Sequence, residues 1–271
     1  MTTKKIILAS ASALGLLASF HSPALAQDSV AGAPQAEDGQ TAYGDIIVTA
    51  QKREEKLSDV GITIAAIGAA QLAERSIQSL ADVAAAVPGL SYINSANNTP
   101  VYNLRGVGFY DTSLGSYPTT SVYVDQVPLP FPVLTNLTAF DLQRIEVLKG
   151  PQGTLFGQNS TGGAINYIAN KPSRDVEAGF EASYGRFDQI IGSGYVSGPL
   201  SDTVRARLAL RVEDSGPWQQ SYTRDDQNGR AENYAGRVLI DWDASDTLKF
   251  ELNLNGWVDK NEPPGSPVYE V

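Results

Sequence analysis

The C-terminal third of the chain alternates apolar and polar residues with a period of two. This period is typical of β-strands that have one apolar and one polar face. The alternation predicts strands at 177–184, 189–198, 204–212, 234–242 and 248–258, of which the second is weaker and rich in glycine. The polar face of these strands repeatedly carries Arg and Glu, and no helix is expected after Pro172.

Strands of about ten residues with such different faces are typical of an antiparallel transmembrane β-barrel with a wet interior. Four aromatic residues lie near strand ends on the predicted apolar face, namely Tyr184, Tyr195, Tyr234 and Trp242. Barrels carry such residues where the membrane meets water. A soluble β-sandwich has the same alternation and is the alternative.

The lengths of the connections also favour a barrel. The connections at 199–203 and 244–247 are short, and the connection at 214–232 is long and polar. Outer-membrane barrels have short turns on the periplasmic side and long loops outside. This rule places Trp218, Tyr222 and Arg224 on an extracellular loop. Five strands cannot close a barrel of about 22 strands, so the chain is expected to be a fragment or a truncated product.

The preceding region, residues 51–172, has a different sequence pattern, a mixture of short helical and strand segments. This pattern predicts one compact α+β domain. Helices are expected at 71–75 and 79–87, with Ser79 as the N-cap and Pro88-Gly89 as the stop. Short strands are expected at 45–50, 61–67, 101–105, 121–127, 144–148 and 163–169. The fold class is therefore an α+β domain followed by the beginning of an antiparallel transmembrane β-barrel, which is incomplete in this chain.

The N-terminus has the layout of a secretory signal peptide. Lys4 and Lys5 precede an apolar run at 6–20 and a small-residue cleavage site at 24–26. We expect residues 1–26 to be removed and residues 27–44 to form a flexible leader. The apolar run is shorter than the roughly 20 residues that a spanning helix needs.

The exported chain has few residues that support catalysis. It has no cysteine, and its only histidine, His21, lies in the signal peptide. Catalytic sites that use His or Cys, and metal sites built from His and Cys, are therefore excluded. We expect that the protein is not an enzyme and binds no cofactor or metal ion. Loss of two lysines with the signal peptide changes the net charge from −10 to −12, which disfavours nucleic acid as a partner.

The most specific motif is the run from Asp141 to Asn166, DLQRIEVLKGPQGTLFGQNSTGGAIN. It resembles the plug-domain signature of TonB-dependent receptors, an acidic residue followed by RIEV, a basic residue, Gly-Pro and a later Gly-Gly-x-Ile-Asn. The stretches 104–106 and 122–128 match the same family in order and spacing. The resemblance covers about residues 45–258 and implies a plug domain followed by barrel strands in the outer membrane of a Gram-negative bacterium.

The segment DIIVTA resembles the TonB box of this family. It comprises Asp45, Ile46, Ile47, Val48, Thr49 and Ala50. A short β-branched segment after a flexible leader suits a partner that binds by adding a strand. The resemblance implies that these residues bind TonB of the inner-membrane energy-coupling complex.

Charged residues of the plug carry a second implied role. In the family, plug arginines and glutamates pair with charges on the inner barrel wall, and the matching positions are Arg105, Arg144, Glu146 and Lys149. Their expected role is to lock the plug in place. Gln126 departs from the usual Asp-Gly of this family, and because Gln disfavours positive φ, we expect a different turn there.

The family implies active uptake of a scarce nutrient, with a ferric siderophore as the leading ligand. Cobalamin and oligosaccharides are the alternative ligands. Two other functions are also considered, namely a signalling receptor, and a non-functional product or a plug that binds ligand in the periplasm. The plug apices are expected at 94–99 and 109–117. Phe109, Tyr110 and Tyr117 are the candidates for stacking on the ligand, with ordinary loop packing as the alternative role.

Overall fold

The computed structural model describes residues 46–77, 79–95, 98–111, 117–136, 139–157, 159–221, 225–263 and 265. The chain divides into two units, Met1–Ala42 and Tyr43–Val271, and all described residues belong to the second unit. The predicted signal peptide and leader, together with Asp45, lie outside the described residues. No helix among the described residues is long and apolar enough to cross a membrane.

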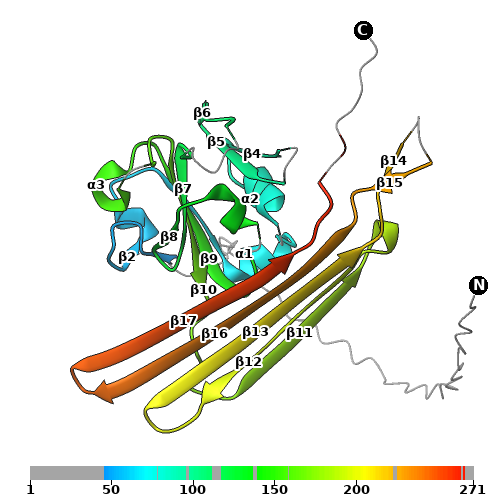
Figure 1. Ribbon diagram of the computed structural model, residues 1–271. Helices are drawn as coiled ribbons and strands as arrows, with labels where there is room; N and C mark the ends of the chain where they lie inside the picture. Colours follow the sequence, from blue (N-terminus) through cyan, green and yellow to red (C-terminus); the bar gives the residue numbers. More distant parts are fainter. Residues whose placement is uncertain are drawn as a thin grey trace, which may run out of the picture. The chain divides into compact units, whose positions relative to one another are not determined.

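The first part of the second unit is built on a five-stranded sheet (Figure 1). The strand order is β3 (Ile64–Gly68), β9 (Leu142–Lys149), β10 (Gly163–Ala169), β7 (Thr120–Val124) and β8 (Val127–Leu129). Strands β10 and β7 are parallel, and the other neighbours are antiparallel. The signature run therefore supplies two of the three inner strands of this sheet, β9 and β10.

Smaller elements cover the sheet. The helices are α1 (Ala69–Glu74), α2 (Leu80–Ala86) and α3 (Gly153–Phe156), with 3₁₀ turns at Leu57–Asp59 and Pro132–Thr135. A three-stranded sheet contains β4 (Leu90–Asn94), β5 (Pro100–Leu104) and β6 (Val107–Gly108), and a two-stranded sheet contains β1 (Ile47–Val48) and β2 (Glu55–Lys56). The predicted cap of α2 is confirmed, because Ser79 and Asp82 form a reciprocal capping box.

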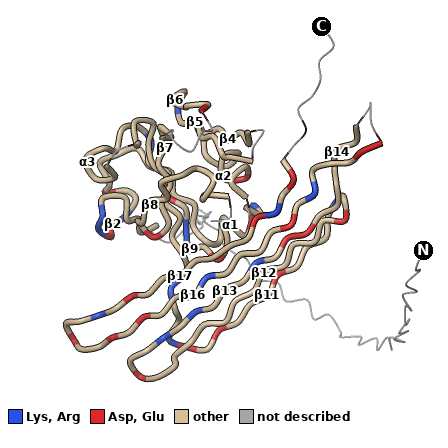
Figure 2. Tube along the Cα trace, in the orientation of Figure 1, with Lys and Arg blue, Asp and Glu red and all other residues tan. Residues whose placement is uncertain are grey.

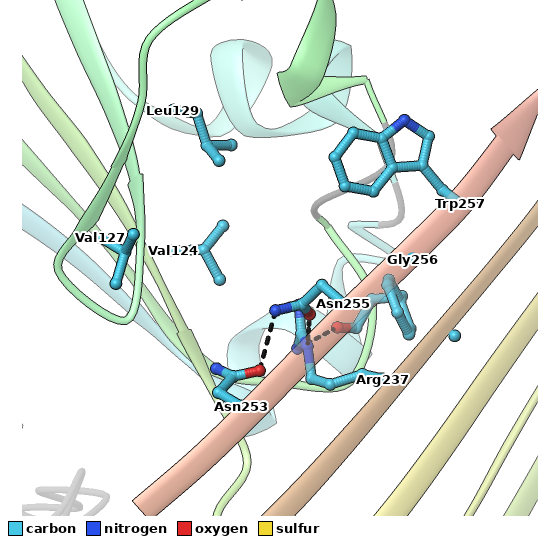
Figure 3. A pocket seen from close by; sticks show the side chains of 10 residues that line it. Val124, Val127, Leu129, Arg237, Asn253, Asn255, Gly256 and Trp257 are labelled. Carbon is cyan, nitrogen blue, oxygen red and sulfur yellow. Dashed lines mark hydrogen bonds between the residues drawn. The ribbon is translucent and has the colours of Figure 1, made fainter.

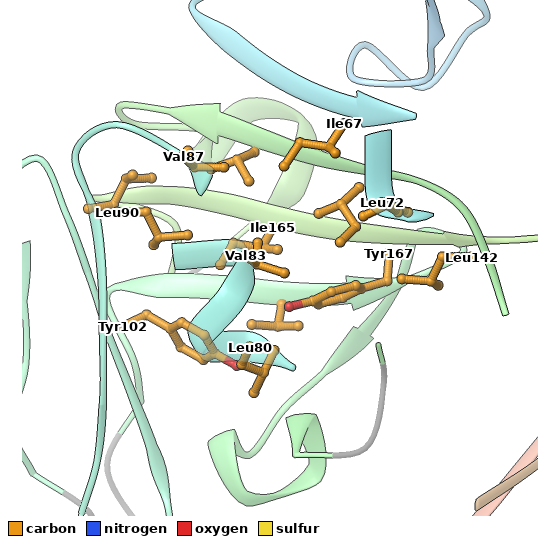
Figure 4. Close-up of a cluster of buried hydrophobic side chains, with 14 of the residues drawn as sticks. Ile67, Leu72, Leu80, Val83, Val87, Leu90, Tyr102, Leu142, Ile165 and Tyr167 are labelled. Carbon is orange, nitrogen blue, oxygen red and sulfur yellow. The ribbon is translucent and has the colours of Figure 1, made fainter. Parts of the chain in front are cut away.

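The main hydrophobic core lies between one face of the five-stranded sheet and the helices α1 and α2 (Figure 4). Ile145, Ile165 and Tyr167 of the sheet are fully buried against Leu80 and Val83 of α2. Alternate residues of β9 and β10 point to the opposite face, where Glu146 and Asn166 are also fully buried. A buried carboxylate in a sheet needs partners, so this second face becomes the centre of the candidate site.

The predicted alternating strands form a second five-stranded sheet, which is antiparallel throughout. Its order is β11 (Glu177–Tyr184), β12 (Ile190–Pro199), β13 (Val204–Ser215), β16 (Ala231–Ser245) and β17 (Leu248–Asp259). The hairpin β14 (Gln219–Gln220) and β15 (Gln227–Asn228) lies in the long connection, and Arg186–Asp188 forms a 3₁₀ turn. Figure 2 shows charged residues recurring along these strands.

The two faces of this second sheet differ as predicted, with one correction. Phe180, Leu210 and Leu254 on the apolar face are exposed, whereas Arg207 and Arg237 on the other face are buried. Tyr195 was predicted on the apolar face, and this prediction is wrong. Tyr195 is in register with Ala209, which in turn is in register with Arg237, and residues in register share a face.

The turn at Asp125–Gln126 also corrects an expectation. Both residues have positive φ, 46° and 67°, as a two-residue hairpin turn of the favoured type requires. The Gln126 backbone N–H donates to Oδ1 of Asn166 at 3.2 Å, and Asp125 Oδ1 accepts from the Ala169 N–H at 3.0 Å. These contacts hold the left-handed conformation without glycine.

Candidate functional site

The N-terminal strand β1 is packed into the domain rather than free. Ile47 and Val48 pair with Lys56 and Glu55 of β2. Val48 and Ala50 are completely buried, and both belong to a cluster with Tyr123, Leu148, Phe156 and Ala164. Segment 46–50 therefore covers the face of the five-stranded sheet that lies opposite α1 and α2.

A single carboxylate holds this segment in place. The Thr49 backbone N–H donates to Oε1 of Glu146 at 2.8 Å, and the Thr49 hydroxyl donates to the same oxygen at 3.2 Å. Arg144 Nε also donates to Glu146 Oε1, at 2.7 Å, and Arg144 Nη2 donates to Thr49 Oγ1 at 3.4 Å. Charge-assisted hydrogen bonds of this kind are stronger than neutral ones.

The chain just after this segment is fixed by an aromatic contact. Lys52 Nζ lies 4.7 Å from the centroid of the Phe156 ring and 5.5 Å from that of Tyr123. The two rings pack edge to face at 5.0 Å between centroids. A lysine over an aromatic face is held by the ring quadrupole. The turn at 49–52 is therefore held at its start by the Thr49–Glu146 hydrogen bonds and at its end by Lys52 over these rings.

A second cluster joins the start of β9 to the other sheet. Arg207 of β13 binds the Asp141 carboxylate with both guanidinium arms, and its Nε lies 2.8 Å from Oδ2. Arg237 of β16 donates from Nη1 to the backbone carbonyl oxygens of Phe140 at 3.0 Å and Asp141 at 3.2 Å. Arg237 Nε binds Oδ1 of Asn255 on β17 at 2.7 Å.

Aromatic rings complete this cluster. The Arg207 guanidinium carbon lies 3.9 Å from the Tyr195 ring centroid, and that of Arg237 lies 4.7 Å from the Phe140 ring centroid. Arg207 is 5% exposed and Arg237 is 2% exposed. These two buried guanidinium groups, with this many hydrogen-bond and aromatic partners, form an anchor between the plug side and the second sheet.

Further contacts join the two sheets along β17 and β12. Asn253 Nδ2 donates to Oδ2 of Asp125 at the β7–β8 turn. Ser173 Oγ donates to Oγ of Ser197 at 2.8 Å, and Lys171 Nζ lies 2.8 Å from Oε2 of Glu251. Burial lowers the pKa of Lys171, but the hydrogen bond to Glu251 and its negative charge outweigh burial, so the pKa is raised overall. Lys171 therefore stays charged at neutral pH.

The three aromatic candidates for a ligand site are exposed. Phe109 is 48%, Tyr110 is 65% and Tyr117 is 55% exposed. The turn between β4 and β5, which is the other predicted plug apex, lies at the end of the second sheet that carries the long connection, because Asn98 Nδ2 donates to the Asn261 carbonyl oxygen at 3.3 Å. Trp218 on that connection is also exposed.

The comparisons with known proteins agree with this architecture. Residues 56–164 match the family model described as the TonB-dependent receptor plug domain. The pesticin receptor of Yersinia pestis is 29% identical over 219 residues, which are 76% of this chain and 31% of that receptor. Residues 56–164 therefore match the plug domain of the TonB-dependent receptors, and the chain is similar to members of that family.

Two further relatives extend the comparison. The ferric-pyoverdine 358 receptor of Pseudomonas putida is 23% identical over 243 residues, which are 88% of this chain and 28% of that receptor. The crystal structure of the ferric yersiniabactin uptake receptor of Yersinia pestis matches with a TM-score of 0.63 and 26% identity, over 72% of this chain and 31% of that one. The chain therefore spans less than a third of the length of each of these relatives.

The predicted fold is confirmed as a plug domain followed by antiparallel strands of an incomplete barrel. We therefore call the part before Pro172 the plug and the sheet β11–β17 the barrel sheet. The family model at 56–164 lies inside the predicted plug boundaries of 51–172. Val48, Thr49 and Ala50 of the predicted TonB box are buried in the plug, whereas Ile47 is 40% exposed. Binding of TonB by 45–50 stays a prediction.

The four residues predicted to lock the plug to the barrel make their described contacts inside the plug. Arg144 and Glu146 bind each other and Thr49. Lys149 Nζ donates to the Pro88 carbonyl oxygen at 2.9 Å, and the Arg105 backbone N–H donates to that of Gly89 at 2.7 Å. Pairing of these four with a barrel wall stays a prediction.

The described contacts with the barrel sheet come from residues that the sequence did not single out, chiefly Asp141 and Asp125. Asp141 is the acidic residue that opens the signature, so the motif contained a signal for it. Arg207 and Arg237 appeared only as members of a polar strand face. No cluster of three His, Cys, Asp or Glu side chains suited to a metal ion occurs among the described residues.

Proposed function

We propose that this chain forms the plug and the first barrel strands of an outer-membrane transporter that takes up a ferric siderophore with energy supplied through TonB. The observation that carries the proposal is the attachment of segment 46–50 to β9 through Glu146. The plug offers a short strand that can be withdrawn while the start of β9 remains fixed to the barrel sheet. The relatives named as ferric-siderophore receptors support the choice of ligand.

The geometry defines what TonB has to do. Val48 and Ala50 are buried and β1 already pairs with β2, so a partner that adds a strand can bind only after the segment leaves the plug. Departure removes the Thr49 N–H from Glu146 and uncovers the sheet face around Leu148 and Ala164. A carboxylate that was buried and paired becomes hydrated, which weakens the plug where the pull is applied.

Ligand would bind at the opposite, extracellular end. Phe109, Tyr110 and Tyr117 are our candidates for contact with the ligand, together with Trp218, because their rings are exposed. Exposed aromatic rings provide large contact areas and stack on planar groups of a ligand. No bond is made or broken in the function we propose, so the protein acts by binding and transport and not as an enzyme.

The substrate is tested by deleting the gene for this chain in its host under iron starvation. Uptake of radioactive iron is measured with a panel of ferric siderophores, and radioactive cobalamin and oligosaccharides are measured in parallel. We expect a loss of at least tenfold for one ferric siderophore, restored by the intact gene. If only the uptake of cobalamin or of an oligosaccharide is lost, that compound is the ligand instead of a ferric siderophore. If the uptake of no compound changes, the transport function is rejected.

The TonB-binding segment is tested with Val48→Pro in the intact receptor. Proline removes the backbone N–H and breaks strand pairing, so we expect crosslinking to TonB and uptake to disappear. Binding of the ferric ligand to whole cells should stay unchanged because the extracellular end is not altered. Val48→Ile keeps the backbone N–H and an apolar β-branched side chain at this buried position and is the control. Normal crosslinking by the proline variant would reject the assignment.

A further inference from the structure

The buried side chain of Asn166 on β10 meets a single hydrogen-bond partner among the described residues. It is completely buried, and its Oδ1 accepts the Gln126 backbone N–H at 3.2 Å. A backbone N–H can only donate, so this contact fixes which amide atom is the oxygen. The other atom, Nδ2, is buried and has no partner within the part of the chain that the structure describes. Such buried donors are rare in folded proteins.

The residue beside Asn166 in the sheet is Glu146 of β9. The two residues are in register, and residues in register lie on the same face with their Cβ atoms about 4.5–5.5 Å apart. Glu146 is also completely buried. A buried carboxylate is therefore the direct neighbour of a buried amide donor that it does not bind.

The partners of the Glu146 carboxylate crowd one of its two oxygens. Oε1 accepts from the Thr49 N–H at 2.8 Å, from the Thr49 hydroxyl at 3.2 Å and from Arg144 Nε at 2.7 Å. Oε2 has only a long contact of 3.4 Å with the same hydroxyl. Two of the three donors on Oε1 belong to Thr49, so the N-terminal segment fixes the orientation of this carboxylate.

The oxygen of the Asn166 amide supports the turn between β7 and β8. Asp125 and Gln126 have φ of 46° and 67° there, a region that residues other than glycine seldom occupy. The Gln126 N–H is held by Asn166, and the Ala169 N–H is held by Asp125 Oδ1 at 3.0 Å. Asp125 Oδ2 accepts from Asn253 of β17. The turn therefore connects Asn166 to the barrel sheet.

This turn has room to shift. A cavity of about 140 Å³ lies between the β7–β8 hairpin and strands β16 and β17 (Figure 3). Its lining includes Val124, Val127 and Leu129 of the hairpin and Trp257 of β17. Because the hairpin is not packed tightly against β17 here, the turn can relax without a clash.

We propose that Asn166 is a positioning residue that changes its partner when the N-terminal segment leaves, and so couples that segment to the barrel sheet. The proposal rests on the release of segment 46–50 that the proposed function requires. Departure of Thr49 removes two of the three donors from Glu146 Oε1, and water hydrates the side that is uncovered. On the side of β10 the carboxylate accepts from Asn166 Nδ2, because an amide donates a stronger hydrogen bond to a charged oxygen than neutral groups form.

The change of partner reaches the barrel sheet through the turn. Rotation of the Asn166 amide toward Glu146 moves Oδ1 away from the Gln126 N–H, so Gln126 loses the contact that holds its positive φ. Glycine would keep this φ without support. Relaxation of the turn then weakens the contact of Asp125 with Asn253. Release of the N-terminal segment therefore loosens the plug from β17 at this turn.

The coupling is tested by amide hydrogen exchange at single-residue resolution in the complete receptor, without TonB or ligand. Val48→Asp places a charge at a completely buried position, which drives the segment out of the plug. Ile47→Asp places the same charge at the neighbouring position, which is 40% exposed, and is the matched control. We expect the Gln126 and Ala169 amides to exchange at least tenfold faster in Val48→Asp and at the parent rate in Ile47→Asp.

Two double variants separate a change of partner from general loosening. Val48→Asp with Glu146→Leu removes the acceptor toward which Asn166 turns, so the Gln126 amide should return to within twofold of the parent rate. Val48→Asp with Gln126→Gly keeps the turn left-handed without Asn166, so the Ala169 amide should stay protected.

Three results would overturn the coupling. They are a Gln126 amide that ignores Val48→Asp, a Gln126 amide that stays fast when Glu146→Leu is added, and an Ala169 amide that is equally fast when Gln126→Gly is added. None of these measurements involves TonB or uptake. Failure of the coupling therefore leaves the transport function to be judged by the uptake assay.

Discussion

Strand β9 is attached at two places, and the two attachments differ in kind. At its start, Asp141 and the preceding carbonyl group are held by Arg207 and Arg237, which come from two strands of the barrel sheet. In its middle, Glu146 is held by its neighbour Arg144 and by Thr49 of the N-terminal segment. The first attachment joins rigid sheets, and the second holds a strand of two residues.

This difference indicates which attachment yields to a pull. The Asp141 anchor combines a two-armed ion pair, two carbonyl contacts and two aromatic stacks, and most of these groups are buried. The Thr49 contacts are hydrogen bonds from a short strand at the edge of the plug. Pairing with β2 and burial of Val48 and Ala50 add to the hold on this segment. We expect that a pull on segment 46–50 releases the segment before it moves the start of β9.

The largest effect is expected from Arg207→Ala. It leaves the Asp141 carboxylate buried without its charge partner, and breaking such a pair costs about 3–5 kcal/mol. Amide hydrogen exchange in outer-membrane vesicles should speed up along β9 and the plug residues facing β13. Arg186→Ala removes an exposed guanidinium and is the control. Unchanged exchange in Arg207→Ala would show that the anchor contributes little.

A smaller and more local effect is expected from Glu146→Ala. The variant removes the acceptor of the Thr49 N–H and leaves Arg144, whose side chain is 11% exposed, without its partner. We expect a cost of about 2–3 kcal/mol for these lost charged contacts. Faster exchange should be confined to 47–49 and the middle of β9, and crosslinking to TonB should increase without ligand. If the residues that loosen are the same as in Arg207→Ala, the two attachments are not distinct.

The smallest effect is expected from Thr49→Val, which removes the hydroxyl that donates to Glu146 at 3.2 Å and accepts a long contact from Arg144 at 3.4 Å. One such hydrogen bond contributes about 1 kcal/mol, or roughly a fivefold shift toward the released segment. Crosslinking to TonB without ligand should rise by that factor. Thr49→Ser keeps the hydroxyl and should behave as the parent does. If Thr49→Val has an effect as large as that of Glu146→Ala, the Thr49 hydroxyl alone accounts for the attachment of the N-terminal segment to Glu146.

Local signals in the sequence determined the type and order of most elements. The strands of the barrel sheet follow from alternation over about ten residues, and the cap and stop of α2 follow from Ser79 and Pro88-Gly89. The signature run from Asp141 to Asn166 identified the plug and contributes to two of the three inner strands of its five-stranded sheet. These features are local, so each can be inferred from neighbouring residues.

The tertiary structure decided which residues meet. Tyr195 was assigned to the wrong face because Gly192 and Gly194 carry no side chains that fix the phase of the alternation, and a shift by one residue reverses every side chain. Gln126 has positive φ because Asn166 and the hairpin hold it there. Local pattern alone does not reveal such partners.

The candidate site divides in the same way. The sequence by itself predicted a short β-branched strand within 45–50, of which Ile47–Val48 form β1, and an alternation of apolar and charged residues along β9. Only the tertiary structure showed that Glu146 holds Thr49, 97 residues away, and that Arg207 of the barrel sheet binds Asp141, 66 residues away. The reason is physical, because hydrogen bonds and ion pairs depend on distance in space, and strand periodicity fixes only the face on which a side chain lies.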